Sequence, residues 1–338
     1  LAALAMVAGA FATPSHAVGS EPASVLIYTV QRSGPDFFTI VSVTNTNTLK
    51  ASPNNLGGTT DVHYEYVNAN PSGNPLRPDG CNIVDRVETL TPADTLSVLT
   101  TCHNAFTPGG QMGYLVVSAL QPSGASLTTW EHDWLVGSEM VVNASGVVYS
   151  LNAIPFTAAK KKAPANVGDG AADPTDGILM FDDMEYESAP EALIIDSFVA
   201  VSGSHLTLLN LTGGDRDVNK IRLVAYTDNE FQLSDTFEFN CWFDQPLTDV
   251  SQIFQESFLK STVNDPTELD ISCTGDGRLE TGWVLIDSIS VKTPGGSLLA
   301  NDGVVLGSIT AGEFTNMDGG RLLWETSARQ SNGAFPNP

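Results

Sequence analysis

The chain contains one short apolar motif twice, as GYLVV at Gly113–Val117 and as GWVLI at Gly282–Ile286. A run of apolar residues introduced by a glycine is typical of a buried β-strand. In each copy the glycine of a second motif follows, 24 residues later in LVGS at Leu135–Ser138 and 25 residues later in VLGS at Val305–Ser308. The nearly equal spacing indicates that one structural unit occurs twice.

Three further landmarks keep the same order in both copies. TIVSVT at Thr39–Thr44 opens the first copy, and TLLNLT at Thr207–Thr212 opens the second. Between the opening motif and the GYLVV or GWVLI motif, each copy has two cysteines: Cys81 and Cys102 in the first, Cys241 and Cys273 in the second. Five matched features in one order predict a tandem duplication.

Short apolar or alternating runs separated by Gly, Pro, Asn and Ser predict strands along most of the chain. The alternation in VHYEY at Val62–Tyr66 predicts a strand with one buried and one solvated face. The predicted strands follow one another at spacings of roughly 10–20 residues, which favours antiparallel sheets over βαβ units. We therefore expect an all-β protein of tandem antiparallel β-sandwich domains, immunoglobulin-like or jelly-roll-like, each with one disulfide.

The expected domain boundaries follow from composition. Residues 1–17 have an apolar run and the small residues of a signal peptidase site, which predict a secretory signal peptide. Residues 18–156 and 191–338 are the two expected sandwich domains. Residues 157–190 are expected to be an acidic linker, in which Ile178–Phe181 could add a strand to either domain. The signal peptide predicts a secreted protein, extracellular or at the cell surface.

The four cysteines allow three pairings. Because each copy holds two, Cys81–Cys102 and Cys241–Cys273 are the economical choice, and an exported protein meets an oxidising compartment. Closing a loop of about 22 residues, as a Cys81–Cys102 bond would, stabilises the fold by about 3–4 kcal/mol in the chain-entropy model. A structural zinc site is the alternative, but neither pair has the close spacing that zinc sites use.

The formal net charge is −24. Such a surface repels nucleic acid and anionic lipid, so we expect neither as a partner, and no stretch after the signal peptide has the length of a membrane span. An acidic surface of this kind would attract divalent cations or basic partners. The alternative interpretation is that the acidity only keeps an exported protein in solution.

An acidic loop is the main candidate metal site. It places carboxylates on a turn-forming segment that could supply the oxygen ligands of Ca²⁺, from Asp169, Asp173, Asp176, Asp182 and Asp183. The EF-hand pattern fails, since Ala171 stands where a carboxylate or amide is required. The alternative is a solvated linker with no ion, and no other cofactor is expected.

Tryptophans supply the second candidate site. Trp130 and Trp134 lie close together in the sequence and could form a platform for a sugar. Trp283 occupies the place of Tyr114 in the duplicated motif and is expected in the core. Trp242 follows Cys241 and is expected to pack against a disulfide.

No nucleophile elbow, zinc-protease motif or phosphate-binding loop is present, so we expect no enzyme. The favoured function is an exported structural or surface protein that assembles with itself, as an oligomer or filament, or adheres to other surface components. A calcium- or carbohydrate-binding extracellular module is the first alternative. A secreted hydrolase with an unrecognised site is the second.

Overall fold

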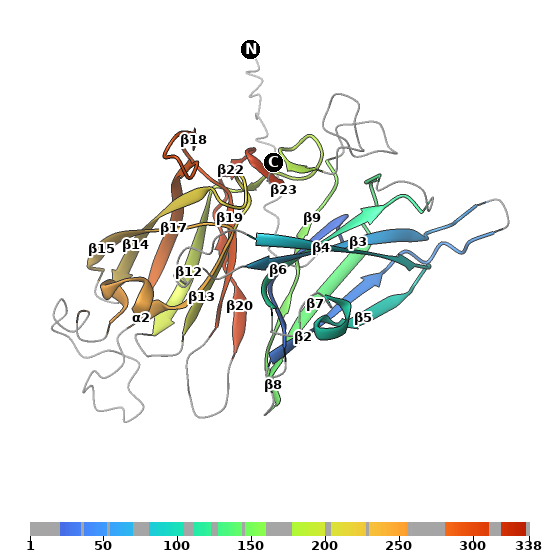
Figure 1. Cartoon of the computed structure of the whole chain (residues 1–338), viewed down its shortest axis with the longest axis horizontal. Helices are drawn as coiled ribbons and strands as arrows, with labels where there is room; N and C mark the ends of the chain where they lie inside the picture. The colour runs from blue at the N-terminus through green and yellow to red at the C-terminus, as the bar shows by residue number, and fades with distance from the viewer. Residues whose placement is uncertain are drawn as a thin grey trace, which may run out of the picture.

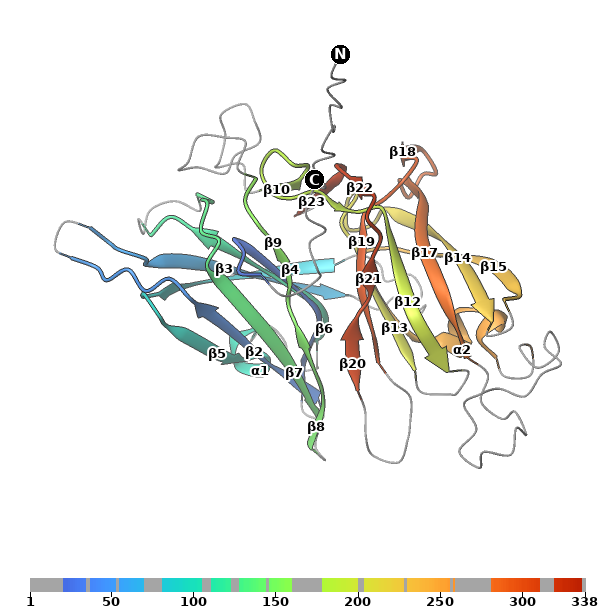
Figure 2. The same ribbon diagram turned by 180° about the vertical axis from the view of Figure 1, so that it is seen from behind.

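The computed structural model shows a mostly β protein of antiparallel sheets with almost no helix (Figures 1 and 2). It describes residues 21–34, 37–52, 55–69, 81–104, 111–122, 128–143, 146–159, 178–199, 204–227, 230–255, 258, 281–310 and 319–335. The expected signal peptide lies outside these residues. No helix within the described ranges has the length and apolar character needed to span a membrane.

The first half forms one nine-stranded sheet. Its elements are β1 Val25–Ser33, β2 Phe37–Asn45, β3 Thr60–Ala69, β4 Cys81–Leu90, β5 Thr95–Leu99, α1 Thr100–His103, β6 Gln111–Leu120, β7 Leu135–Asn143, β8 Gly146–Asn152 and β9 Ile154–Phe156. β1 and β2 are paired only at Ser33 and Phe38, so the sheet has two arms, β4-β3-β6-β1-β9 and β5-β2-β7-β8. Side chains from both arms, such as Tyr64 of β3 and Val41 of β2, share one buried core.

The second half contains two separate sheets with the orders β15-β14-β17-β12-β21 and β16-β13-β19-β20. Its elements are β12 Ala192–Val199, β13 His205–Asn210, β14 Val218–Thr227, β15 Gln232–Phe239, β16 Trp242–Pro246, α2 Leu247–Val250, the 3₁₀ turn η1 Gln252–Phe254, β17 Thr281–Lys292, β18 Leu298–Ala300, β19 Val305–Thr310, β20 Gly320–Leu322 and β21 Trp324–Glu325. Leu208 of β13 and Ile286 of β17 belong to the core between these sheets.

The two halves have the same strand order. β1 to β9 correspond to β12, β13, β14, β15, β16, β17, β19, β20 and β21, and β18 is the additional strand of the second half. The register is interrupted at the same place in both, between Tyr28 and Gln31 of β1 and between Ile195 and Phe198 of β12. A shared irregularity of this kind supports the duplication more strongly than strand order alone, because bulges are kept as features of a fold.

The opening motifs of the two copies align differently in the structure than in the sequence, by three residues. The glycines of LVGS and VLGS pair with Val43 and Leu208, so Leu208 corresponds to Val43 and Thr207 corresponds to Ser42. The expected match of Thr39 with Thr207 was wrong. Both motifs begin and end with Thr and are otherwise mostly apolar, which favours the match of Thr39 with Thr207 when only the sequence is considered.

A third core joins the halves. The arm β4-β3-β6-β1-β9 turns its second face to the sheet β16-β13-β19-β20, and the shared cluster includes Ile27, Val116, Leu209, Trp242 and Leu306. We call this cluster the central contact. β1, β3, β6, β13 and β19 are consequently buried on both faces along most of their length.

The segment expected to be an acidic linker contributes to this contact where it is described. β10 Leu179–Phe181 pairs with β23 Gly333–Phe335, and β11 Ala189–Pro190 pairs with β22 Arg329–Gln330. Phe181 and Tyr186 are fully buried in the central contact. The chain between the halves therefore closes one end of the shared core.

The disulfide differs from both expected bonds. Cys81, at the start of β4, is bonded to Cys241, which lies between β15 and β16, so the bond joins the two halves. Cys102 is free and exposed in α1, and Cys273 lies outside the described residues. The Cys81–Cys102 and Cys241–Cys273 pairings were wrong, because the docking of the halves brings together residues 160 positions apart.

We expect Cys81→Ser/Cys241→Ser to lower the free energy of unfolding, by up to about 5 kcal/mol in the chain-entropy model for a loop of this length. Denaturant titration of the oxidised protein measures the loss. The matched control Cys102→Ser should leave stability unchanged. Peptide mapping without reduction should find the Cys81–Cys241 link, and a Cys81–Cys102 peptide would contradict the structure.

The glycine that opens each repeated motif is required by a close backbone approach. A Cβ on Gly113 would overlap the carbonyl oxygen of Val67, and a Cβ on Gly282 would overlap that of Tyr226. Val67 and Tyr226 are equivalent positions on β3 and β14. The motif thus begins with glycine in both halves for one steric reason.

We expect Gly113→Ala and Gly282→Ala each to destabilise the protein by about 1–3 kcal/mol, the typical cost of forcing extra volume into packed structure. Gly295→Ala is the control, because its Cβ would meet only Thr293 Oγ1 at 3.8 Å. Thermal denaturation compares the three variants, and equal melting temperatures would contradict the steric explanation.

Candidate functional site

Buried polar groups connect the halves at the central contact. The indole Nε1 of Trp242 donates to the carbonyl oxygen of Thr29 at 3.0 Å, and the hydroxyl groups of Thr29 and Ser308 lie 2.8 Å apart. All three side chains are buried. These directional bonds fix how the first half sits on the second, which apolar packing alone would leave less defined.

A charged pair lies in the same contact. Arg32 Nη2 is 2.7 Å from Asp244 Oδ2, and Asp244 Oδ1 accepts from Thr207 Oγ1 at 3.1 Å and lies 3.5 Å from His205 Nδ1. Burial by itself would raise the pKa of Asp244, but His205, Arg32 and Thr207 outweigh burial and hold that pKa below its ordinary value. The carboxylate is therefore ionised, and its partners supply the compensation that a buried charge needs.

We expect Asp244→Asn to destabilise the protein at pH 7 by about 2 kcal/mol, the scale of a hydrogen bond to a charged group. Because the folded-state pKa is lowered, the carboxylate stabilises the protein above pH 3.8, and this stabilisation is lost as the pH falls further. The unfolding free energy of the variant should therefore fall less steeply with decreasing pH than that of the wild type. Urea titrations from pH 7 to pH 2 measure this. Asp196→Asn, which breaks an exposed ion pair with Arg321, is the control and should change little.

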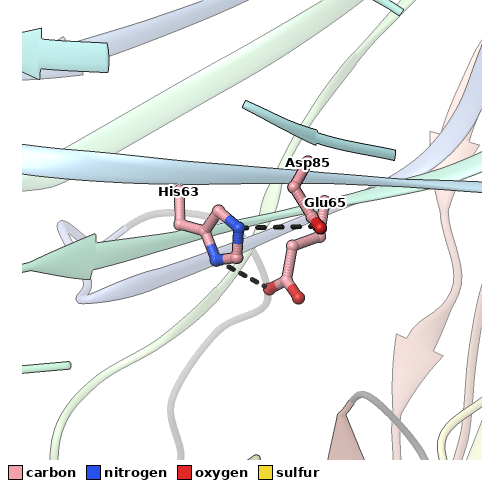
Figure 3. A group of neighbouring side chains, drawn as sticks. All are labelled: His63, Glu65 and Asp85. Atoms are coloured by element: carbon pink, nitrogen blue, oxygen red, sulfur yellow. Dashed lines mark ion pairs between the residues drawn. The ribbon is translucent and has the colours of Figure 1, made fainter. Parts of the chain in front are cut away.

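A cluster of His63, Glu65 and Asp85 lies on the edge strand β4 and its neighbour β3 in the first half (Figure 3). His63 and Glu65 are two residues apart on β3 and share one face, and Asp85 of β4 is directly opposite Glu65. His63 Nδ1 is 3.6 Å from Glu65 Oε2, and His63 Nε2 is 3.5 Å from Asp85 Oδ1. One ligand atom from each residue lies within 4.8 Å of the others.

Burial governs the charge of this cluster. Burial, followed by repulsion from Asp85, raises the pKa of Glu65 to about 8. Burial also lowers the pKa of His63, although Asp85 opposes that change. The expected solvated face of Val62–Tyr66 was wrong: His63 and Glu65 are 9% and 6% exposed, and they lie on the same side of β3 as Val67, which belongs to the central contact.

The second half presents aromatic residues on the outside of its larger sheet. Tyr226 and Trp283 are stacked with ring centroids 4.5 Å apart, and Trp283 and Trp324 are 39% and 56% exposed. Paired strands align Val224, Leu285, Ile194 and Trp324 in one row across the sheet. We call these six residues the aromatic face. Trp283 was expected in the core, and that was wrong, because it lies on the face of β17 opposite the buried Val284 and Ile286.

The residues proposed for calcium are only partly described. Asp169, Asp173 and Asp176 lie outside the described residues. Asp182 Oδ1 accepts from the backbone N–H groups of Met184 and Glu185, and Asp183 Oδ1 accepts from Ser188. Two carboxylates thus shape the loop after β10, and the calcium site stays a prediction.

Trp130 and Trp134 have different surroundings. Trp130 packs against the core of the first half, stacks on His132 at 5.3 Å and donates from Nε1 to Thr60 Oγ1. Trp134 is 49% exposed. A flat platform made from both rings stays a prediction. Trp242 is buried in the same cluster as Cys241, as its position after that cysteine suggested.

Sequence analysis missed the His63 cluster and the aromatic face. A histidine and a glutamate two residues apart in a strand were visible, but Asp85 is 20 positions beyond Glu65 and only strand pairing joins them. For the aromatic face, the unused signal was the match of Trp283 with Tyr114, since equivalent positions need not be equally buried.

Comparisons with known proteins leave the chain without an assigned family. No family model and no curated protein matches it. A cryo-EM structure of the T=1 Penaeus vannamei nodavirus is 12% identical over 77% of this chain and 83% of that chain, with a TM-score of 0.09. A similarity this weak supports no statement about fold or function.

Proposed function

We propose that this protein is a non-enzymatic exported structural protein, built from two β-sandwich domains, that assembles head-to-tail with further copies of itself. Its partner is a second copy of the chain, and its location is extracellular or at the cell surface. The disulfide between the halves and the expected signal peptide support export. The single observation that carries assembly is the aromatic face.

The aromatic face repeats the positions through which the first half makes the central contact. Strand pairing gives each residue of the aromatic face an equivalent position in the first half. In matching order, the aromatic face is Ile194, Val224, Tyr226, Trp283, Leu285 and Trp324, and the equivalent positions are Ile27, Glu65, Val67, Tyr114, Val116 and Ile154. All six residues of the first half are buried, and all except Glu65 belong to the central contact. In the second half the same positions remain apolar although both tryptophans are exposed, which supports an interaction surface here.

The central contact is heterologous, since it joins one sheet of the first half to the other sheet of the second half. A contact of this type leaves one unused copy of each surface and can therefore repeat between molecules as a ring or a filament. The second unused surface is the outside of β2, β5 and β7, toward the other end of the molecule from β14 and β17 (Figure 1). The proposed contact places the aromatic face of one copy on this surface of the next.

The receiving surface combines apolar and hydroxyl rows. Leu99, Ile40 and Met140 are paired across β5, β2 and β7 and are half-buried or exposed. Beside them Ser42 and Ser97 are hydrogen-bonded at 2.8 Å, and Thr44 and Thr95 at 2.9 Å. Because these hydroxyl groups satisfy one another, the surface can lose water at a smaller cost than unpaired polar groups would impose.

We expect the wild-type protein to form concentration-dependent oligomers, measured by light scattering after gel filtration and by electron microscopy. Trp283→Lys/Trp324→Lys should reduce assembly, because it places charges on the aromatic face. Ile40→Lys/Met140→Lys should do the same from the receiving surface. Leu299→Ser, an exposed apolar residue on β18, is the control and should assemble normally.

Mixing the two lysine variants tests the head-to-tail arrangement. Each retains one intact surface, so an equimolar mixture should give heterodimers that do not grow further. A symmetric contact between two aromatic faces would instead let the Ile40→Lys/Met140→Lys variant dimerise by itself. A monomeric wild-type protein at millimolar concentration, or a Trp283→Lys/Trp324→Lys variant that loses binding to polysaccharides and not assembly, would overturn the proposal and favour a carbohydrate-binding module.

A further inference from the structure

We propose that His63, Glu65 and Asp85 form a binding site for one divalent transition-metal ion of the zinc type, held between β3 and β4 of the first half. The site lies at the edge of the central contact and is separate from both assembly surfaces. Its three residues are also different from those of the acidic loop, where calcium was expected.

One ring nitrogen of His63 is buried without a hydrogen-bond partner. His63 is 9% exposed, and its Nε2 atom is buried without a hydrogen-bond partner although it points toward Asp85 at 3.5 Å (Figure 3). Buried polar atoms in native proteins are almost always paired, so an unpaired one needs an explanation such as an ion. An ion shared by the imidazole and the two carboxylates would satisfy it.

The strand register places a second acidic group beside Glu65. Glu65 and Asp85 are directly opposite each other on neighbouring antiparallel strands, where both can be ionised together only if a cation lies between them; otherwise Glu65 keeps its proton. Glu65 is 6% exposed. Arg86 donates to the backbone carbonyl oxygens of Asp85 and His103, and Arg32 pairs with Asp244, so neither arginine is engaged with Glu65. Within the described residues, His63 is the one basic side chain that pairs with Glu65. A cation fits the place that the charge pattern leaves.

The ligand set indicates the class of ion. One imidazole nitrogen with two carboxylates suits Zn²⁺ and its neighbours in the first transition series, whereas Ca²⁺ and Mg²⁺ are bound by oxygen ligands alone. The side chain of Asp85 is 62% exposed, so water can complete the coordination shell. The three ligand atoms lie within 4.8 Å of one another, and binding would draw them to the roughly 3.4 Å that separates the ligands of a tetrahedral Zn²⁺ site.

The second half gives an internal comparison. Strand pairing matches His63, Glu65 and Asp85 with Arg222, Val224 and Ser234. None of these three supplies a metal ligand of the required type. The site is therefore a property of the first half, and a stoichiometry of one ion per chain follows.

The experiment uses the full oxidised chain, with free thiols alkylated so that Cys102 cannot bind the metal. Isothermal titration with ZnCl₂ in 10 mM Mg²⁺, which occupies weak acidic sites, should show one bound ion. Saturating Zn²⁺ should raise the melting temperature by roughly 5 °C, the shift expected at about 100-fold excess over Kd. Ca²⁺ in place of Zn²⁺ should give no comparable shift.

Asp85→Asn and Glu65→Gln should each weaken Zn²⁺ binding by at least tenfold. Asp85 is exposed, so its variant tests the site without disturbing the fold. Glu88→Gln is the matched control: Glu88 is on the same strand and lies 3.4 Å from a histidine, His103, but the described part of the chain adds no third ligand there. The absence of any zinc-dependent shift in the wild-type protein, or equal zinc binding by Asp85→Asn and Glu88→Gln, would overturn the proposal. Oligomer formation is measured separately, so the metal site and the assembly contact can fail independently.

Discussion

Burial of the apolar surface shared by the two halves is the constraint on which the rest of the structure depends. It covers the second face of β1, β3, β6, β13 and β19, and their side chains are buried on both sides as a result. Removal of either half would expose a continuous apolar sheet to water. The Cys81–Cys241 bond and the bonds of Trp242 and Thr29 hold this contact in one arrangement.

The same burial encloses ionisable groups, and the protein compensates for each of them differently. Asp244 stays charged beside Arg32, Thr207 and His205. Glu139 is fully buried; its pKa is raised by burial, against hydrogen bonds from Val30 N and the Thr29 hydroxyl group. In the His63 cluster one ring nitrogen has no hydrogen-bond partner, and Glu65, whose pKa is raised, lies opposite the carboxylate of Asp85. A bound ion would supply the missing charge there.

Duplication gives the two halves one topology and leaves them in different environments. Tyr114 and Trp283 occupy equivalent positions, yet Tyr114 is 2% exposed and Trp283 is 39% exposed. The difference arises because each half offers two outer sheet faces and the central contact uses one from each. The remaining two faces carry half-buried or exposed side chains among the described residues, and the aromatic residues on one of them are the physical basis of the proposed assembly.

The sequence by itself determined the local structure: the strands, the glycines before both GYLVV-type motifs, and the repeat of one strand order. These follow from side-chain periodicity and from sterics within a few residues. Only the tertiary structure decided which strand faces are covered, why His63 and Glu65 are buried, and which cysteines are bonded. Those outcomes depend on how two distant segments approach each other. Neither apolar periodicity nor cysteine spacing encodes the distance between Cys81 and Cys241, which the docking of two complete halves sets.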